Sequence, residues 1–268
     1  MARGIVLLKL GGSLITDKTR PGVARPAMIR RLAKEIAAAL RKSPGARVLV
    51  GHGSGSYGHA AASEGGLIRG ADARRRRDAI AHTQLRAADL HRIVVAALAD
   101  AGARPFSFAP SSFLHASGGR ITGRFVEPIF AALTRGLLPV VYGDVVLDAK
   151  RGAVIVSTEE LFVLIAKEAA SRRIPVARAV WLGETDGVND GDGAPIARLS
   201  SASALRTARR VNGASGLDVT GGMALRLRAA GALASTGVPS CIVDGRKPGT
   251  LAAAIAGVSP GGTRVDSR

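Results

Sequence analysis

Residues 9–18 read Lys-Leu-Gly-Gly-Ser-Leu-Ile-Thr-Asp-Lys, and a short apolar run, residues 5–8, comes directly before them. The apolar run predicts a buried β-strand, and the two glycines predict a tight loop at its end. In such a loop the backbone N–H groups can approach an anion, and the flanking lysines add positive charge. A lysine at the end of a buried strand is costly without an anionic partner. Lys9 and Lys18 are therefore candidate phosphate-binding residues, although the spacing is not that of a Walker loop.

A second glycine-rich loop follows a predicted strand at residues 46–50. Residues 51–59 read Gly-His-Gly-Ser-Gly-Ser-Tyr-Gly-His. A row of small residues leaves many backbone N–H groups open to a bound phosphate. His59 closes this loop, where its ring could donate a hydrogen bond to a phosphate oxygen. His52, at the end of the strand, is expected either to be a packing residue or to support residues that contact the ligand.

A third loop, residues 218–223, reads Asp-Val-Thr-Gly-Gly-Met and precedes a helix that we expect to end near residue 235. The beginning of that helix can hold an anion, and Arg226 lies one turn into it. Asp218 and Thr220 could also serve only as helix caps, so a structural role stays open for this loop.

The predicted strands alternate with predicted helices along the whole chain. This alternation predicts an α/β fold with a mostly parallel sheet that helices cover on both faces. Two hairpins are expected near residue 121 and over residues 145–156, and residues 263–265 are expected to add an edge strand. We expect one domain, residues 1–268, with an acceptor-binding lobe over about 1–170 and a nucleotide-binding lobe over about 171–268. Ligands bind at the carboxyl ends of the strands in such sheets.

Composition limits the remaining classes of function. The 268 residues hold 38 lysines and arginines against 20 acidic residues, which gives a net charge of +18. Only seven of the 38 are lysine, and this excess of arginine fits coding bias better than a nucleic-acid surface, which should cluster and include stacking aromatics. Arg74 to Arg77 form the one basic run, in a stretch expected to be helical. With 47% apolar residues, the chain is not a disordered protein.

Other classes are excluded by what the sequence lacks. The single cysteine, Cys241, allows neither a disulfide framework nor a cysteine-built zinc site. No run of 18 apolar residues and no signal peptide is found, so we expect a cytoplasmic protein with no membrane partner. The sequence shows no serine-hydrolase motif and no metal-ligand pattern, so we predict no metal held by the protein itself.

The motifs together resemble those of the amino acid kinase superfamily and, within it, of the isopentenyl phosphate kinases. The matching segments occur in the family's order and span nearly the whole chain: residues 9–18, 52–59, 142–146, 218–223 and 262–264. The resemblance implies an open αβα sandwich, a homodimer, and transfer of the γ-phosphoryl group of ATP to a phosphate monoester. The acceptor would be isopentenyl phosphate, with a place in isoprenoid biosynthesis through the mevalonate pathway.

The resemblance also implies roles for individual residues. Lys9 would contact the transferred phosphoryl group, Lys18 would stabilise its transition state, and Asp144 would orient the basic groups. The ATP site, with Mg²⁺ on the nucleotide phosphates, would include Lys9, Gly11, Gly12, Gly55, Asp186, Gly221, Gly222 and Arg226. The acceptor site would include Ser54, Gly58, His59, Ser157 and Thr158. Because the acceptor is itself an anion, the site needs positive charge rather than a carboxylate base.

The chain departs from the family pattern at several of these positions. Arg226 stands where lysine is usual, and Ser54 replaces a glycine. Residues 157–160 read Ser-Thr-Glu-Glu in place of Ser-Gly-Asp-Asp, and the Cβ of Thr158 is expected to crowd a backbone contact that glycine allows. Residues 183–189 read Gly-Glu-Thr-Asp-Gly-Val-Asn, without the usual tyrosine and one aspartate.

Three alternatives remain open at this point. One is a phosphonate kinase of the fosfomycin-resistance type, with the same fold and a shorter, more polar acceptor pocket. Residues 79–98 and 106–113, the candidate pocket walls, are largely apolar and favour the isoprenoid. The others are a non-catalytic nucleotide-binding protein, which the intact Lys9, Lys18 and His59 oppose, and a nucleic-acid binder, which only the net charge suggests.

Overall fold

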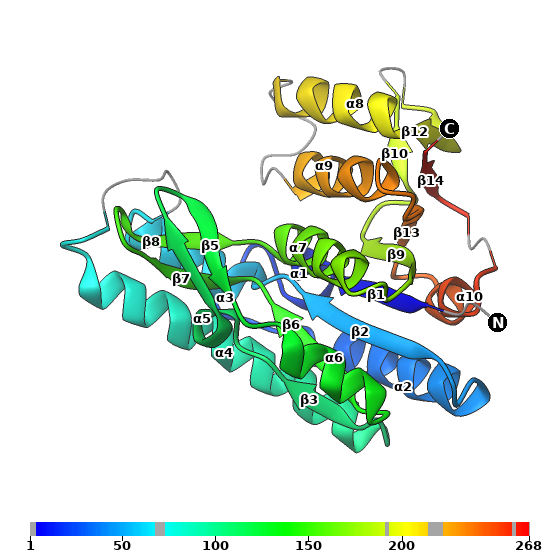
Figure 1. The fold of residues 1–268 in the computed structure, drawn as a ribbon, viewed down its shortest axis with the longest axis horizontal. Helices are drawn as coiled ribbons and strands as arrows, with labels where there is room; N and C mark the ends of the chain where they lie inside the picture. The colour runs from blue at the N-terminus through cyan, green and yellow to red at the C-terminus, as the bar shows by residue number, and fades with distance from the viewer. Residues whose placement is uncertain (1–3, 68–72, 191–192, 214–221, 259–260, 268) are drawn as a thin grey trace.

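The computed structural model describes residues 4–67, 73–190, 193–213, 222–258 and 261–267. Its centre is an eight-stranded sheet in the order β12-β14-β13-β9-β1-β2-β6-β3 (Figure 1). All neighbours in this sheet are parallel except β13 and β14. The strands are β1 (Ile5–Leu10), β2 (Arg47–His52), β3 (Pro105–Ser107), β6 (Leu138–Tyr142), β9 (Val176–Gly183), β12 (Arg198–Ser200), β13 (Ser240–Asp244) and β14 (Thr263–Asp266).

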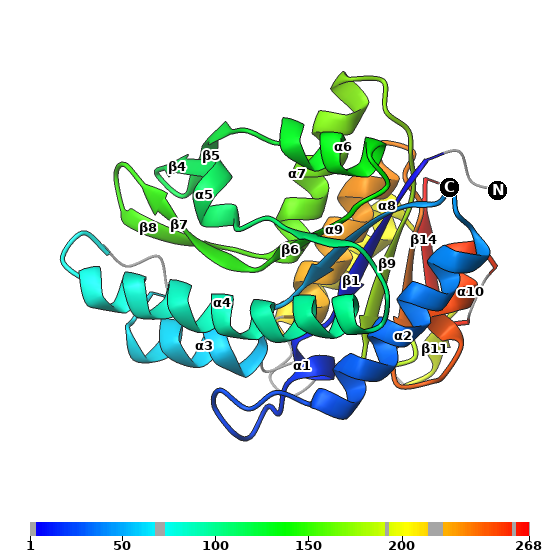
Figure 2. The same cartoon turned by 90° about the horizontal axis from the view of Figure 1, so that it is seen from below.

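Helices cover both faces of the sheet, as the αβα prediction requires (Figures 1 and 2). One layer consists of α1 (Gly12–Ile15), α2 (Pro26–Lys42), α4 (Arg77–Asp100) and α10 (Thr250–Ala256). The other consists of α6 (Glu127–Thr134), α7 (Thr158–Ser171), α8 (Ser201–Gly213) and α9 (Gly222–Ala234). Arg77 is the first residue of α4, so the basic run of residues 74–77 mostly precedes the helix and does not lie within it.

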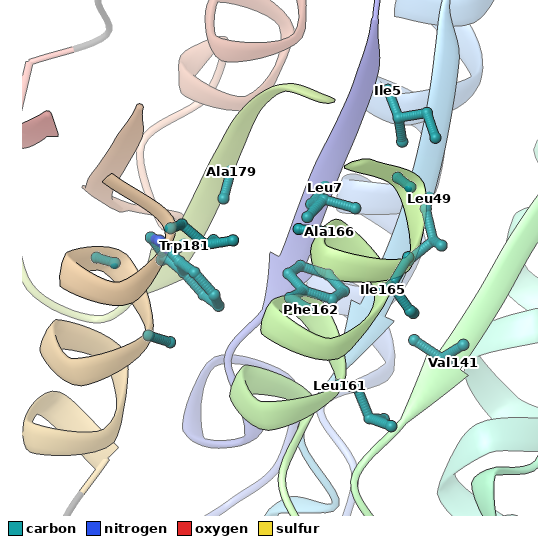
Figure 3. Packing of buried hydrophobic residues seen from close by; sticks show 14 of the residues in the cluster. Ile5, Leu7, Leu49, Val141, Leu161, Phe162, Ile165, Ala166, Ala179 and Trp181 are labelled. Carbon is teal, nitrogen blue, oxygen red and sulfur yellow. The ribbon is translucent and has the colours of Figure 1, made fainter. Parts of the chain in front are cut away.

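The two layers enclose separate apolar cores, because successive side chains of a strand point to opposite faces. In β1, Ile5 and Leu7 pack under α6 and α7, whereas Val6 and Leu8 pack under α2 and α4. Figure 3 shows the first core, in which the ring centroids of Phe162 and Trp181 lie 5.5 Å apart. A strand buried on both faces reads as a continuous apolar run, which is why residues 5–8 were recognisable.

A smaller sheet extends beyond one end of the central sheet. Its order is β5-β4-β7-β8, and it contains both predicted hairpins: β4 (Leu114–Ser117) with β5 (Arg120–Arg124), and β7 (Asp144–Asp148) with β8 (Gly152–Val156). The helices α3 (Gly55–Glu64) and α4 lie beside it, and α5 (Pro110–Phe113) precedes β4 (Figure 1). A two-stranded ribbon joins β10 (Val188–Asn189) and β11 (Pro195–Ile196).

The predicted edge position of residues 263–265 is wrong. They form β14, which lies between β12 and β13. Thr263 explains this inner position, because its hydroxyl donates to the carbonyl of Ile196 at 2.6 Å and accepts from the N–H of Val188 at 2.7 Å. These contacts connect segments far apart in the sequence, so no local pattern could reveal them.

Candidate active site

The loops that follow β1, β2, β6 and β9 meet at one edge of the central sheet. Because parallel strands end on the same side, loops from distant parts of the sequence become neighbours there. Three backbone hydrogen bonds connect them: Gly11 N–H to Leu182 O (2.9 Å), Gly53 N–H to Leu10 O (3.1 Å) and Gly143 N–H to His52 O (3.0 Å). The first two predicted glycine loops therefore form one continuous structure.

Gly12 and Gly55 bring these two loops into direct backbone contact. A Cβ on Gly12 would lie 2.8 Å from the Cα of Gly55, and a Cβ on Gly55 would lie 2.7 Å from Cγ2 of Thr16. Gly55 also has a positive φ of 52°, which favours glycine. The Thr16 hydroxyl donates to the carbonyl of Gly12 at 2.8 Å and accepts from the N–H of Ser56 at 3.0 Å. Both glycines are thus required for the loops to approach this closely.

Two helices begin side by side at this edge. Ser54 is the N-cap of α3, and Ser157 is the N-cap of α7. A Cβ built on Gly143 would lie 3.6 Å from the N of Ser54 and 3.8 Å from the N of Thr158, so the first turns of both helices flank this glycine. The N-terminus of a helix favours an anion, and two of them together favour a phosphate group.

Lys9, on β1, and Glu159, in the first turn of α7, form an ion pair at this edge. Only 7% and 6% of their side-chain surfaces are exposed. Burial lowers the pKa of the Lys9 ammonium. The negative charge of Glu159 opposes this lowering, and the positive charge of Arg226 adds to it. Burial alone would raise the pKa of the Glu159 carboxyl, but Lys9 and then Arg226 outweigh it, so that this pKa is lowered. The lowered pKa favours the ionised form of Glu159, so Lys9 has an anionic partner within the protein.

Arg226 joins the same cluster from α9. Its side chain is buried, and its Nη1 lies 2.6 Å from where a Cβ on Gly183 would be, with Nη2 3.6 Å from that of Gly11. The guanidinium therefore packs across the ends of β1 and β9. The cations Lys9 and Arg226 thus lie at this edge together with the carboxylate of Glu159, and positive charge there would favour a bound phosphate.

A family model described as "Amino acid kinase family" matches residues 4–244. The chain belongs to the amino acid kinase family. The isopentenyl phosphate kinase of Methanothermobacter thermautotrophicus is 36% identical over 98% of this chain and 100% of its own. The isopentenyl phosphate kinase of Haloferax volcanii is 33% identical over 96% of this chain and 97% of its own. A solved structure titled "X-ray structures of isopentenyl phosphate kinase" matches with a TM-score of 0.80 and 30% identity over 97% of this chain and 99% of that one. The resemblance inferred from the motifs is confirmed.

His59, on α3, lies near the cluster of Lys9, Glu159 and Arg226 but takes no part in the Lys9–Glu159 ion pair. Part of the imidazole of His59 reaches solvent. Partial burial lowers the pKa of His59, and the positive charge of Lys9 lowers it further, whereas the negative charge of Glu159 raises it. His59 is thus near enough to respond to both charges. Gly58, directly before it, packs against Ser54: a Cβ there would lie 2.6 Å from Oγ of Ser54.

Lys18 and Asp186 lie at the rim of the site and not in its buried centre. Lys18 is half exposed, and its Nζ is 3.6 Å from Oε2 of Glu184, one of the residues that depart from the family pattern. Glu184 also pairs with Arg25 at 2.6 Å. Asp186 pairs with Lys247. In this structure Lys18 contacts neither Lys9 nor Glu159 among the described ion pairs.

Asp144 has contacts other than those the resemblance implied. Its carboxylate accepts from the backbone N–H groups of Ser111 at 3.0 Å and Val145 at 2.8 Å, and burial raises its pKa. Among the described side chains, Lys9 is paired by Glu159 and not by Asp144. Asp144 therefore fixes the start of α5, and its role toward the basic groups stays a prediction.

The departures at residues 157 and 158 have structural explanations. Ser157 and Glu160 form a reciprocal capping box at the start of α7. The Thr158 hydroxyl donates to the carbonyl of His52 at 2.6 Å, and its side chain is buried. The methyl group of Thr158 lies beside Gly51, where a Cβ would be 2.5 Å from it. The expected crowding of a backbone contact by Thr158 stays a prediction.

Sequence reasoning did not identify Glu159, which the structure places in the centre of the site. The available signal was two glutamates in the first turn of a helix that follows a strand end, and this pattern also fits ordinary capping. Gly222 begins α9. Gly221, with Asp218 and Thr220, lies outside the described residues.

The described residues contain no group of three or more potential metal ligands, and none of their helices is long and apolar enough to span a membrane. The glycine cradle at Gly12 and Gly55, with the two helix N-termini, suits the phosphates of a nucleotide. The expectation that Mg²⁺ is bound by the nucleotide rather than by protein side chains stays a prediction.

Proposed function

We propose that this protein transfers the γ-phosphoryl group of ATP to isopentenyl phosphate, forming isopentenyl diphosphate and ADP. The observation that supports this most strongly is the buried cluster of Lys9, Glu159 and Arg226 at the ends of β1 and β9 and the start of α7. The relatives named isopentenyl phosphate kinase are similar over nearly their full lengths. The same names do not favour the phosphonate alternative.

In the proposed reaction an oxygen of the acceptor phosphate attacks the γ-phosphorus. The bond from that phosphorus to the oxygen bridging the β- and γ-phosphates breaks, and ADP leaves with the electron pair. Because the acceptor oxygen is already anionic, no proton has to be removed. The main barrier is repulsion between two phosphates, which Lys9, Arg226 and the helix N-termini would reduce. Mg²⁺, when bound with ATP, would neutralise further negative charge on the nucleotide.

Glu159 has a positioning role in this mechanism. A buried lysine without a partner would lose its proton or turn away from the site. The carboxylate favours the charged form of Lys9 and would hold its side chain in place before substrates bind. Gly11, Gly12 and Gly55 would bind the ATP phosphates, while His59, with Ser54 and Gly58, would bind the acceptor phosphate.

A cluster of small apolar residues supports an acceptor with a short hydrocarbon tail. Ala62 lies one helical turn beyond His59 on α3, so both occupy the same side of the helix. It packs with residues of β7, β8 and the segment before α4: Leu67, Ala73, Val145 and Ala153. These side chains are buried against one another, so a place for the hydrocarbon part of the acceptor beside them is a prediction that the comparison of acceptors tests.

The test is a coupled assay for ADP with isopentenyl phosphate, dimethylallyl phosphate, fosfomycin and small phosphate monoesters as acceptors. We expect the highest kcat/KM with isopentenyl phosphate. ADP formation with another acceptor, and none with isopentenyl phosphate, would refute the proposed acceptor but not the kinase. ATP binding with no ADP formed from any acceptor would instead favour the non-catalytic alternative.

We also infer a cytoplasmic homodimer. β3 is an end strand of the central sheet, and Phe106 on it is 49% exposed, as expected of a surface that pairs with another copy. The free, partly buried Cys241 suits a reducing compartment. Light scattering after gel filtration should give twice the monomer mass, and Phe106→Glu should shift it toward the monomer; a monomeric wild type would contradict the dimer.

A further inference from the structure

Two histidines outside the phosphate-binding cluster form a buried hydrogen-bonded chain that leads to it. Nδ1 of His52 lies 3.1 Å from the carbonyl of Gly53, and its Nε2 lies 3.0 Å from Nδ1 of His91. Nε2 of His91 lies 2.6 Å from the hydroxyl of Ser107. His52 ends β2, His91 is on α4, and Ser107 is an exposed residue of β3. The chain therefore runs from the surface to the second glycine loop.

The directions of these hydrogen bonds follow from chemistry. A carbonyl only accepts, so Nδ1 of His52 must hold the proton that faces Gly53. In a neutral ring Nε2 of His52 is then an acceptor, and Nδ1 of His91 must donate to it. Nε2 of His91 accepts in turn from the Ser107 hydroxyl. A single arrangement of protons satisfies every member of the chain, provided that both rings are neutral.

The surroundings keep both rings neutral. Burial lowers the pKa of His52 to about 4, with a smaller contribution from the charge of Lys9. Burial, and then His52, lower the pKa of His91 to about 3. Tyr142, on β6, stacks on both rings, with centroids 4.2 Å from His91 and 5.7 Å from His52. Within the part of the chain that the structure describes, Lys9 on β1 and Tyr142 on β6, with the two histidines themselves, are the titratable groups recorded against this chain.

His52 is also connected to the loops through its backbone. Its carbonyl accepts from Gly143 N–H and from the Thr158 hydroxyl, at the starts of β7 and α7. Its side chain fixes Gly53, which contacts Gly12: a Cβ on Gly53 would lie 3.0 Å from the N of Gly12. A rotation of the His52 ring would therefore disturb the glycine loops, and displacements of about 1 Å near reacting groups can lower rates about 100-fold.

We propose that His91 and Ser107 are positioning residues, which fix the tautomer and orientation of His52 and thereby hold the Gly53–Gly55 loop in its phosphate-binding conformation. This inference rests on the proposed function for its kinetic consequence, but the proton arrangement is a property of the free protein. The alternative is that the two histidines only fill the core, in which case their hydrogen-bonding atoms could be replaced without an effect on activity.

The first test is nitrogen NMR of the wild-type protein with ¹⁵N-labelled histidine, assigned by single substitutions. We expect two of the five histidines, His52 and His91, to be neutral at pH 6 with the proton on Nδ1. A proton on Nε2 of either ring, or a charged ring at pH 6, would overturn the proposal. This measurement requires neither substrate nor turnover.

The second test compares two variants at position 91. In His91→Asn the amide nitrogen can replace Nδ1 and donate to His52, whereas in His91→Leu no donor remains. We expect His91→Leu to lower kcat/KM about 10- to 100-fold and His91→Asn to restore most of it. His82→Asn, at an exposed position of the same helix, serves as the control and should not change kcat/KM.

The outcomes separate this proposal from the proposed function. A folded His91→Leu variant with wild-type kcat/KM would overturn the positioning role. If the wild type binds ATP but does not phosphorylate isopentenyl phosphate, the proposed function fails, and the ATP affinities of the same variants decide the positioning role. If His91→Leu does not fold, the tautomers of the wild type and the milder Ser107→Ala variant decide the positioning role. Ser107→Ala should lower kcat/KM only in part, because water can replace an exposed hydroxyl.

Discussion

The ammonium group of Lys9 and the carboxylate of Glu159 form a buried ion pair, although 150 residues separate them in the sequence. Lys9 ends β1, and Glu159 lies in the first turn of α7. The pair keeps a positive charge in place at the edge of the sheet before any phosphate binds. In a nucleotide complex, the phosphates can share or replace the carboxylate as the partner of Lys9.

Glu159→Gln should destabilise the free protein, because the buried Lys9 would lose the carboxylate with which it forms its ion pair. Breaking a buried pair costs about 3 kcal/mol. ATP with Mg²⁺ should raise the unfolding midpoint of this variant more than that of the wild type, since phosphate supplies the missing anion. Thermal unfolding with and without nucleotide measures both effects.

Glu160→Gln is the matched control for that experiment. It makes the same charge change at the next residue, and glutamine still completes the capping box with Ser157. Its stability should stay within about 0.5 kcal/mol of the wild type. Equal stabilities of Glu159→Gln and Glu160→Gln would contradict the role given to the buried pair.

Gly55→Ala should damage both stability and activity. Its φ of 52° and the nearby Thr16 side chain leave no room for a Cβ without movement of the loop away from Gly12. We expect a loss of about 2 kcal/mol in urea unfolding and a lower kcat/KM for ATP. Gly45→Ala is the control, because a Cβ at Gly45 meets nothing within 4 Å; similar losses in both variants would argue against a specific role for Gly55.

His59→Ala should raise the KM for the acceptor about 10- to 100-fold, the range expected for loss of a hydrogen bond to a charged group. The KM for ATP should change little, because the glycine cradle is intact. Initial rates with each substrate varied in turn separate the two effects. The control is His115→Ala, at an exposed position on β4. A rise confined to the KM for ATP would show that His59 faces the nucleotide instead.

Lys18→Ala should lower kcat about 100-fold, the usual effect of losing a donor that stabilises a transition state. Its half-exposed pair with Glu184 contributes less than about 1 kcal/mol to stability, so the unfolding midpoint should hardly change. Single-turnover measurements at saturating substrates test this separation. An effect limited to acceptor affinity would contradict the transition-state role.

The stability of the protein should fall as the pH is lowered from about 6.5 to 5. His52 and His91 have folded-state pKa values of about 4 and about 3, below the ordinary value of 6.5. Below pH 6.5 the unfolded chain therefore binds protons that the folded chain excludes, and this favours unfolding. Each histidine contributes at most about 1.4 kcal/mol per pH unit.

Urea unfolding at several pH values measures that slope. The control is His82→Gln, which removes an exposed histidine from the same helix as His91 and should leave the slope unchanged. A wild-type stability that is flat between pH 6.5 and 5 would show that the two buried histidines are not held neutral.

The first two glycine loops and the αβα layers could be predicted from local patterns. Glycine pairs, apolar runs and the spacing of apolar residues in helices depend on neighbours in the sequence, so residues 5–18 and 46–59 indicated both strand ends. The position of β14 could not be predicted, because it depends on contacts of Thr263 with Val188 and Ile196. The contacts of Lys18 and Asp144 likewise involve partners from other loops.

The sequence by itself determined the fold class, because it follows from short-range conformational preferences. It also indicated the phosphate-binding loops, because glycines and two of the few lysines occur together there. The tertiary structure alone decided which charges meet. The start of α7 lies beside the end of β1, and this brings Glu159 to Lys9. The packing of α4 against the sheet brings His91 to His52 at the end of β2. Ion pairs and hydrogen bonds act over a few ångströms, so their partners are determined by the packing of strands and helices and not by distance along the chain.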